Sequence, residues 1–257
     1  MIELNYKEFG HGDPLIILHG LFGTLDNWQT MARTLSEHFT VFIVDQRNHG
    51  KSPHTEKHGY ACLAEDLHDF MASKWIYKAN LLGHSMGGKT VMRFATEYPE
   101  MVDKLIVADI APKAYPDTHS QIFNALLSID LTTVSNRQEV DEILTKSIDS
   151  WAIRQFLLKN VTRNKITHRY EWKMNLPVLY KYYKHILKFD LGKEVFEGKT
   201  LFIRGAQSSY IQDEDMLDIL DYFPSAQLQT IEKAGHWLHA DQPEEFFNTI
   251  LTFLEED

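Results

Sequence analysis

The chain has 257 residues, of which 44% are hydrophobic and 24% are charged, and its formal net charge is −10 at pH 7. This composition is typical of a soluble globular protein with a sizeable core, and the negative charge makes nucleic acid an unsuitable partner. A mean hydropathy of −0.32 and the lack of a long uncharged apolar stretch argue against a membrane span. Cys62 is the only cysteine, which excludes an intrachain disulfide, and the N-terminus does not resemble a signal peptide, so we expect a cytoplasmic protein.

Predicted strands and helices alternate over most of the chain. Residues 1–8 alternate apolar and polar side chains like a strand, and five further segments are continuous apolar runs, as in strands buried on both faces. These runs are 14–19, 40–45, 79–82, 104–109 and 200–204, and helical patterns cover 26–38, 60–74, the segment after 85 and 243–254. The alternation predicts a mostly parallel sheet covered by helices on both sides.

One interval interrupts this alternation. Between about residues 115 and 197 no buried-strand pattern occurs, and four amphipathic runs (120–129, 137–147, 150–159 and 179–187) indicate helices. We therefore predict a core made of residues 1–112 and 198–257, with residues 113–197 inserted as a helical cap.

The predicted cap differs from the core in charge. Residues 113–199 contain 14 Lys and Arg against 10 Asp and Glu, and residues 154–188 contain nine Lys and Arg but a single acid, Glu171. Aromatic side chains such as Trp172 and Tyr180 are interleaved with these cations. The pattern fits either a solvated helix face with aromatic anchors or a surface that attracts an anionic substrate, such as a phosphate-bearing thioester.

A Gly-x-Ser-x-Gly motif, Gly83-His84-Ser85-Met86-Gly87, directly follows a predicted strand. A serine at the tip of a sharp strand-to-helix turn needs a positive φ, and side chains two residues before and after it would collide. The amides at the start of the next helix would face an anion formed at Ser85. The motif predicts a nucleophile elbow, with an ordinary strand-to-helix turn as the alternative.

A serine nucleophile needs a general base, and His236 is the candidate among the 13 histidines. It follows the strand-like segment 227–231 and precedes the last helix, where a loop can carry the imidazole toward Ser85. We expect His84 and His239 to be structural neighbours. His54 and His58 have i, i+4 spacing without a placed third ligand, so no metal site is predicted.

Four blocks of the chain resemble the α/β-hydrolase superfamily, namely residues 19–23 (HGLFG), 45–52 (DQRNHGKS), 83–89 (GHSMGGK) and 235–237 (GHW). Within them, and in residues 109–112 (DIAP), the chain is most similar to the YbfF-like esterases. The resemblance implies an α/β-hydrolase fold, with a mostly parallel eight-stranded sheet flanked by helices and a helical cap inserted after strand six.

The position of the acid that would support His236 departs from the usual pattern of the superfamily. In most members of the superfamily it follows strand seven, where this chain has Ser208, and a hydroxyl cannot offset the charge of a histidinium ion. The YbfF-like esterases place the acid after strand six, which implies that Asp109 is the acid and that Ser208 joins its hydrogen-bond network. Asp213 is the alternative, because it lies a few residues after strand seven.

Two backbone amides should form an oxyanion hole. Met86, directly after the nucleophile, supplies one of them, and the resemblance implies Leu21 for the other, with Phe22 as the alternative. We expect Phe22 and Trp237 to line the substrate pocket.

Together these residues predict a serine hydrolase of the carboxylesterase or thioesterase type, acting on a small-molecule acyl ester or thioester, acyl-CoA included. Ser85 would form an acyl-enzyme, His236 would be the general base and Asp109 the orienting acid, with no metal or organic cofactor. The same residues would also allow carbon–carbon bond hydrolysis, lyase chemistry, perhydrolysis or a ligand-sensor role. The acyl chain length, the leaving group and the oligomeric state are left open.

Overall fold

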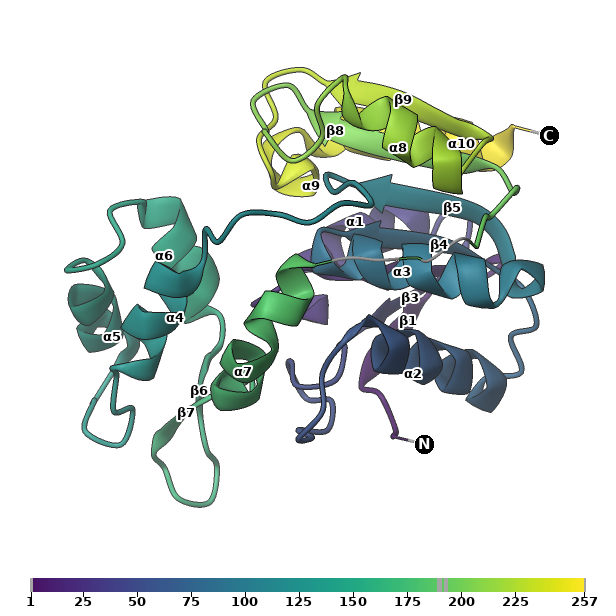
Figure 1. The fold of residues 1–257 in the computed structure, drawn as a ribbon. Coiled ribbons are helices and arrows are strands. Elements are labelled where there is room, and N and C mark those ends of the chain that lie inside the picture. Colours follow the sequence, from purple (N-terminus) through teal and green to yellow (C-terminus); the bar gives the residue numbers. More distant parts are fainter. Residues whose placement is uncertain (1, 189–190, 192–193, 257) are drawn as a thin grey trace.

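The computed structural model describes residues 2–188, 191 and 194–256. Its centre is a seven-stranded sheet in the order β1-β3-β2-β4-β5-β8-β9 (Figure 1). The strands are β1 (Tyr6–Phe9), β2 (Pro14–Leu18), β3 (Thr40–Val44), β4 (Ala79–His84), β5 (Val102–Ala108), β8 (Thr200–Gly205) and β9 (Ala226–Ile231). Neighbouring strands are parallel except for β1 and β3, which confirms the predicted mostly parallel sheet.

The described part of the main sheet has seven strands, whereas eight were expected. The described residues before β2 supply one strand, β1. Asn5 still accepts a hydrogen bond from the amide of Asp45 at 2.9 Å, one position beyond the last β1–β3 pair. The predicted cap segment follows β5, the strand before Asp109, which is the fifth described strand in chain order and the one numbered six in the expected eight-stranded fold.

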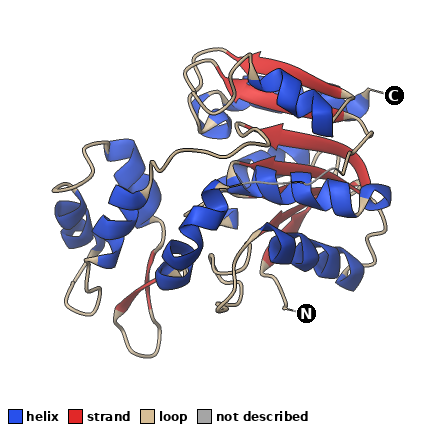
Figure 2. Ribbon diagram, viewed as in Figure 1, coloured by secondary structure: helices blue, strands red, loops and turns tan. Residues whose placement is uncertain are grey.

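Helices cover both faces of the sheet (Figure 2). One face is covered by α2 (Tyr60–Ser73), α3 (Met86–Glu97) and α8 (Asp215–Tyr222), and the other by α1 (Gln29–Leu35) and α10 (Pro243–Glu255). Shorter turns are η1 (Leu25–Trp28), η2 (Pro99–Met101) and α9 (Leu238–Asp241). None of the helices in the described ranges is both long and apolar enough to cross a bilayer.

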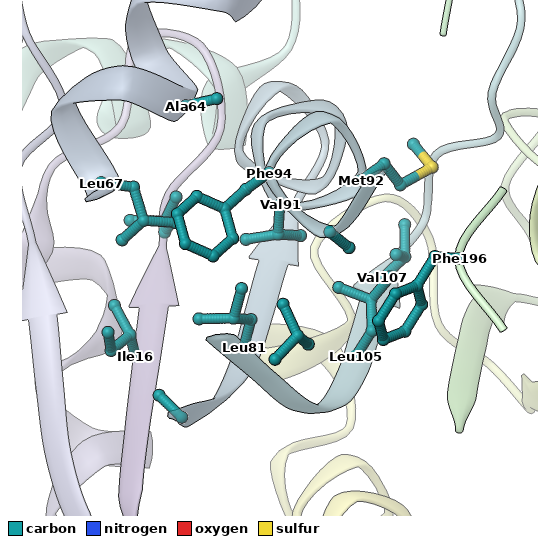
Figure 3. Packing of buried hydrophobic residues seen from close by; sticks show 14 of the residues in the cluster. Ile16, Ala64, Leu67, Leu81, Val91, Met92, Phe94, Leu105, Val107 and Phe196 are labelled. Atoms are coloured by element: carbon teal, nitrogen blue, oxygen red, sulfur yellow. The ribbon is translucent and has the colours of Figure 1, made fainter. Parts of the chain in front are cut away.

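The central helix α3 is fixed by its apolar contacts with the sheet. Val91 and Phe94 are fully buried and lie over Leu81 of β4 (Figure 3). Burying side chains of this size stabilises the fold by about 1.5–3 kcal/mol each. This packing places the first residue of α3 directly beyond the carboxyl end of β4.

Between β5 and β8 the chain forms a separate group of elements beyond the carboxyl ends of the strands (Figure 1). They are α4 (Ser120–Leu127), α5 (Arg137–Leu144), α6 (Trp151–Leu158), β6 (Val161–Arg163), β7 (Tyr170–Trp172) and α7 (Leu176–Leu187). The insertion is not purely helical as expected, because β6 and β7 pair as a short antiparallel hairpin. Strands of three residues are too short to leave a periodic pattern in the sequence. The cap boundaries at residues 113 and 197 stay a prediction.

Candidate active site

Ser85 lies at the junction of β4 and α3 with a φ of +53°. A Cβ atom on Gly83 would lie 2.3 Å from the carbonyl oxygen of Gly87, and one on Gly87 would lie 2.4 Å from that of Leu18. Neither position can hold a side chain without a backbone shift. The two glycines therefore permit the sharp turn that exposes Ser85, and the positive φ stores strain of about 1–3 kcal/mol.

Ser85 and Asp109 occupy equivalent places on adjacent strands. The residues before them, His84 and Ala108, are paired in register between β4 and β5. The amide of Ser85 donates to the carbonyl oxygen of Ala108 at 3.0 Å, and the amide of Asp109 donates to that of Ile203 at 2.8 Å. Asp109 also has a positive φ, +52°, and is fully buried. Both chain turns bring polar side chains to one edge of the sheet.

The Asp109 carboxylate contacts three residues from other parts of the chain. Its Oδ2 lies 2.7 Å from Nδ1 of His236 and accepts a hydrogen bond from the hydroxyl of Ser208, while Oδ1 accepts from the amide of Gly205 at 3.2 Å. Asp213, the alternative acid, has an 86% exposed side chain and pairs with Arg204 at 2.7 Å. The geometry thus brings Asp109, Ser208 and His236 together and leaves Asp213 outside. With Nδ1 held by the carboxylate, Nε2 of His236 is the nitrogen left to exchange a proton.

His236 is held on two further sides. The ring of Tyr210 stacks on its imidazole with centroids 4.0 Å apart and an 18° interplanar angle. His84 binds its carbonyl oxygen through Nε2 at 2.7 Å, and burial holds the pKa of His84 well below its usual range. His239 stacks on Trp28 at 4.2 Å, and burial lowers its pKa to about 3. Both of these histidines are held neutral at neutral pH.

The loop after β2 lies directly against Ser85. A Cβ atom on Gly20 would be only 3.1 Å from Cβ of Ser85. His19 fixes this loop, because its Nδ1 donates to the carbonyl oxygen of Gly20 at 2.8 Å and its Nε2 accepts from the amide of Gln46 at 3.1 Å. β2 and β4 are the strands from which the chain winds in opposite directions across the sheet, a usual place for a ligand site. Sequence reasoning had assigned no role to the His19 side chain or to Gln46.

A cavity of about 850 Å³ opens over Ser85 and His236. Four residues expected around the substrate line it, namely Leu21, Phe22, Met86 and Trp237. Two aromatic lining residues, Phe156 and Trp237, have ring centroids 5.4 Å apart.

The same cavity has a second, polar wall, lined by Tyr60, Lys89, Tyr115 and Tyr210. Sequence reasoning did not single out these four residues. Only Lys89 left a local signal, because it follows Ser85 by one helical turn. His119 also lines the cavity, and burial lowers its pKa to about 4.

No three His, Cys, Asp or Glu side chains converge as metal ligands within the described ranges. The imidazole of His58 is buried and has no hydrogen-bond partner among the described residues, and burial lowers its pKa to about 3. His54 lies at the surface, with Nε2 3.3 Å from the carbonyl oxygen of Lys173.

Most of the described cations in residues 154–188 do not line the cavity. Arg154 pairs with Asp141 at 2.8 Å, and Lys173 lies 3.7 Å from Asp26. Among the described members of this set, Lys159 is the one that lines the cavity. The basic segment therefore contributes one positive charge to the wall of the candidate site.

Comparison with known proteins gives a consistent result along the chain. A sequence profile described as alpha/beta hydrolase fold matches residues 13–142. The chain is 35% identical to esterase YbfF of Escherichia coli (strain K12) over 247 residues, which cover 96% of this chain and 94% of that protein. It is 37% identical to the sn-1-specific diacylglycerol lipase ABHD11 of Danio rerio over 266 residues, covering 99% and 83%. The solved structure of a marine microorganism esterase matches with a TM-score of 0.96 and 44% identity, covering 98% of this chain and all of the other.

Proposed function

The chain belongs to the α/β-hydrolase family, among its esterases and lipases, and we propose that it cleaves carboxylic esters through an acyl-enzyme on Ser85, with His236 as the base and Asp109 as the orienting acid. The observation that carries this proposal is the 2.7 Å contact between Nδ1 of His236 and Oδ2 of Asp109. It fixes the imidazole with Nε2 directed away from the carboxylate, in the cavity that Ser85 also lines.

In the proposed reaction, the hydroxyl of Ser85 attacks the ester carbonyl carbon while Nε2 of His236 accepts its proton. The amides of Leu21 and Met86 stabilise the oxyanion, and each donor is worth about 3–4 kcal/mol of transition-state stabilisation. The imidazolium then protonates the leaving alcohol. A water molecule, deprotonated by His236, hydrolyses the acyl-enzyme and regenerates Ser85.

The buried Asp109 carboxylate supports this cycle electrostatically. Three donors already hold it in place, so it does not need to reorganise when the imidazolium forms. Ser208 supplies one of those donors without adding charge. We therefore assign Ser208 a supporting role.

We further propose that residues 113–197 act as a cap that closes the cavity over Ser85. The described elements of this segment share an apolar cluster that reaches the core through Phe22 and Met86. A mainly apolar cavity of about 850 Å³ suits an acyl ester with a hydrocarbon chain, an acylglycerol included. Acyl-CoA thioesters are a second candidate substrate class, supported by Lys159 in the cavity wall.

An active-site label and a turnover assay test the nucleophile together. A fluorophosphonate probe should label the native protein, and Ser85→Ala should abolish both labelling and the hydrolysis of p-nitrophenyl esters. Ser73→Ala, on α2 and outside the site, is the matched control and should retain both. Undiminished labelling of the Ser85→Ala protein would exclude the assignment, and a single turnover without cycling would indicate a ligand sensor.

A further inference from the structure

Lys89 links the helix that begins after the nucleophile to a helix of the predicted cap. Its backbone amide donates to the carbonyl oxygen of Ser85 at 3.1 Å, and the residue is 2% exposed. The ammonium group donates to the carbonyl oxygens of Leu187 at 3.1 Å and Ile186 at 3.4 Å, at the last turn of α7. The last carbonyls of a helix lack intrahelical partners and carry partial negative charge, so a cation is favourable there.

Two other elements bind the same end of α7. The hydroxyl of Tyr60, at the start of α2, donates to the carbonyl oxygen of Ile186 at 2.8 Å. The amide of Tyr115, in the segment after β5, donates to that of Leu187 at 3.0 Å. We call these contacts of Lys89, Tyr60 and Tyr115 with Ile186 and Leu187 the α7 clasp.

Because Lys89 is buried, protein groups take the place of water around its Nζ atom. Its Nζ lies 4.8 Å from the ring centroid of Tyr115 and 5.7 Å from that of Tyr60. Burial lowers the pKa of Lys89 to about 7. The carbonyl oxygens and rings therefore hold a desolvated amine.

The α7 clasp also borders the candidate site. Tyr183, Ile186 and Leu187 of α7 line the same cavity as Ser85. Any movement of the last turn of α7 would therefore change the shape of the cavity that receives the substrate.

We propose that Lys89 is a positioning residue that fixes α7 against the nucleophile helix and thereby sets how well the cavity binds long-chain esters. This inference rests on the proposed ester hydrolysis at Ser85. It assigns Lys89 no contact with the reacting atoms. Its expected effect is on KM for long substrates more than on kcat.

The variant Lys89→Met removes the donors and keeps the length of the side chain. Lys104→Met is the matched control, because Lys104 also binds the end of a helix. Its Nζ donates to the carbonyl oxygens of Leu254 at 2.8 Å and Phe253 at 3.3 Å, at the end of α10. Lys104 lies near the start of β5, at the opposite end of the strand from Asp109.

The assay compares ethyl acetate, ethyl octanoate and octyl acetate at a pH below the pKa of Lys89. In Lys89→Met we expect KM to rise about tenfold for at least one long ester, the equivalent of ~1.4 kcal/mol, which is close to the lower limit for a hydrogen bond that involves a charged group. KM for ethyl acetate should change less than about twofold, and Lys89→Arg should recover part of the loss. An equal loss for all three esters, or the same selective loss in Lys104→Met, would overturn the proposal.

Hydrogen exchange gives a readout that does not depend on turnover. Amide exchange in the last turn of α7, residues 184–188, should be faster in Lys89→Met than in the wild type and unchanged in Lys104→Met. If the wild type hydrolysed no ester but this difference remained, the proposed function would fail while the α7 clasp stood. Unchanged exchange in Lys89→Met would exclude the clasp itself.

Discussion

The hydroxyl of Ser208 donates a hydrogen bond to Oδ2 of Asp109, the same oxygen that lies 2.7 Å from Nδ1 of His236. Asp109 follows β5 and Ser208 follows β8, the adjacent parallel strand. A neutral donor at position 208 supports a carboxylate that arrives from the neighbouring strand, whereas a second carboxylate there would repel it. A serine where an acid is usual thus fits an acid supplied by β5.

Asp109→Asn should lower kcat by about 10⁴-fold, because the amide would hold the imidazole in the wrong tautomer and could not balance its positive charge. Steady-state hydrolysis of a p-nitrophenyl ester measures this loss. Asp213→Asn is the control and should retain activity, since Asp213 is exposed and paired with Arg204. Full activity of Asp109→Asn combined with a loss in Asp213→Asn would reverse the assignment of the acid.

Ser208→Ala should be milder, because Asp109 keeps the amide of Gly205 and the imidazole of His236 as partners. Loss of one hydrogen bond to a charged group, about 1.5–3 kcal/mol, corresponds to a drop of roughly 10- to 150-fold in kcat/KM. Ser208→Asp should be worse than Ser208→Ala, owing to charge repulsion. The pH profile of kcat/KM should differ between Ser208→Ala and Ser208→Asp. Equal profiles would argue against charge repulsion as the cause of the larger loss in Ser208→Asp.

Gly20→Ala should mainly lower the activity, whereas Gly87→Ala should mainly lower the thermal stability. The added methyl group at Gly20 would lie 3.1 Å from Cβ of Ser85, so we expect a fall in kcat with a small change in Tm. At Gly87 it would lie 2.4 Å from the backbone oxygen of Leu18, so the elbow itself should be displaced and Tm should fall. Thermal unfolding and ester turnover of the two variants test this contrast. Equal losses of Tm in the two variants would show that the loop at Gly20 cannot accommodate the methyl group by a local shift.

The free energy of unfolding should decrease as the pH falls below 6.5, in part because of His239. Burial lowers its pKa from 6.5 to about 3, so between these values the unfolded chain binds more protons than the folded protein. The buried His58 and the partly buried His119 act in the same direction. Urea unfolding across this pH range should show a shallower dependence for His239→Phe, which keeps a ring against Trp28. The exposed His11→Phe is the control, and an unchanged slope in His239→Phe would refute the contribution of His239.

Ionic strength should distinguish the two candidate substrate classes. If acyl-CoA is a substrate attracted by Lys159, then kcat/KM for it should fall as salt rises, whereas a neutral ester should be nearly insensitive. Lys159→Ala should reduce the salt dependence for acyl-CoA only. The same salt response for both substrates would remove the argument for an anionic leaving group.

Much of the fold and the outline of the candidate site could be predicted from the sequence alone, because they depend on local patterns. Apolar runs located β2, β3 and β5 within one to two residues at their ends, and the elbow glycines follow from backbone sterics. The N-terminal alternation predicted a strand within residues 1–8, and β1 begins there at Tyr6, whereas the expected eighth strand came from the resemblance alone. The β6–β7 hairpin was missed because it is too short to show a period.

The tertiary structure decided which distant side chains meet. The contact of Asp109 with Ser208 and His236, and the separation of Asp213 from them, depend on the order and register of β5, β8 and β9. The ammonium of Lys89 reaches a carbonyl 98 positions further along the chain only because α3 and the end of α7 meet at one edge of the sheet. Such contacts leave no periodicity in a sequence, since they depend on how separate segments pack.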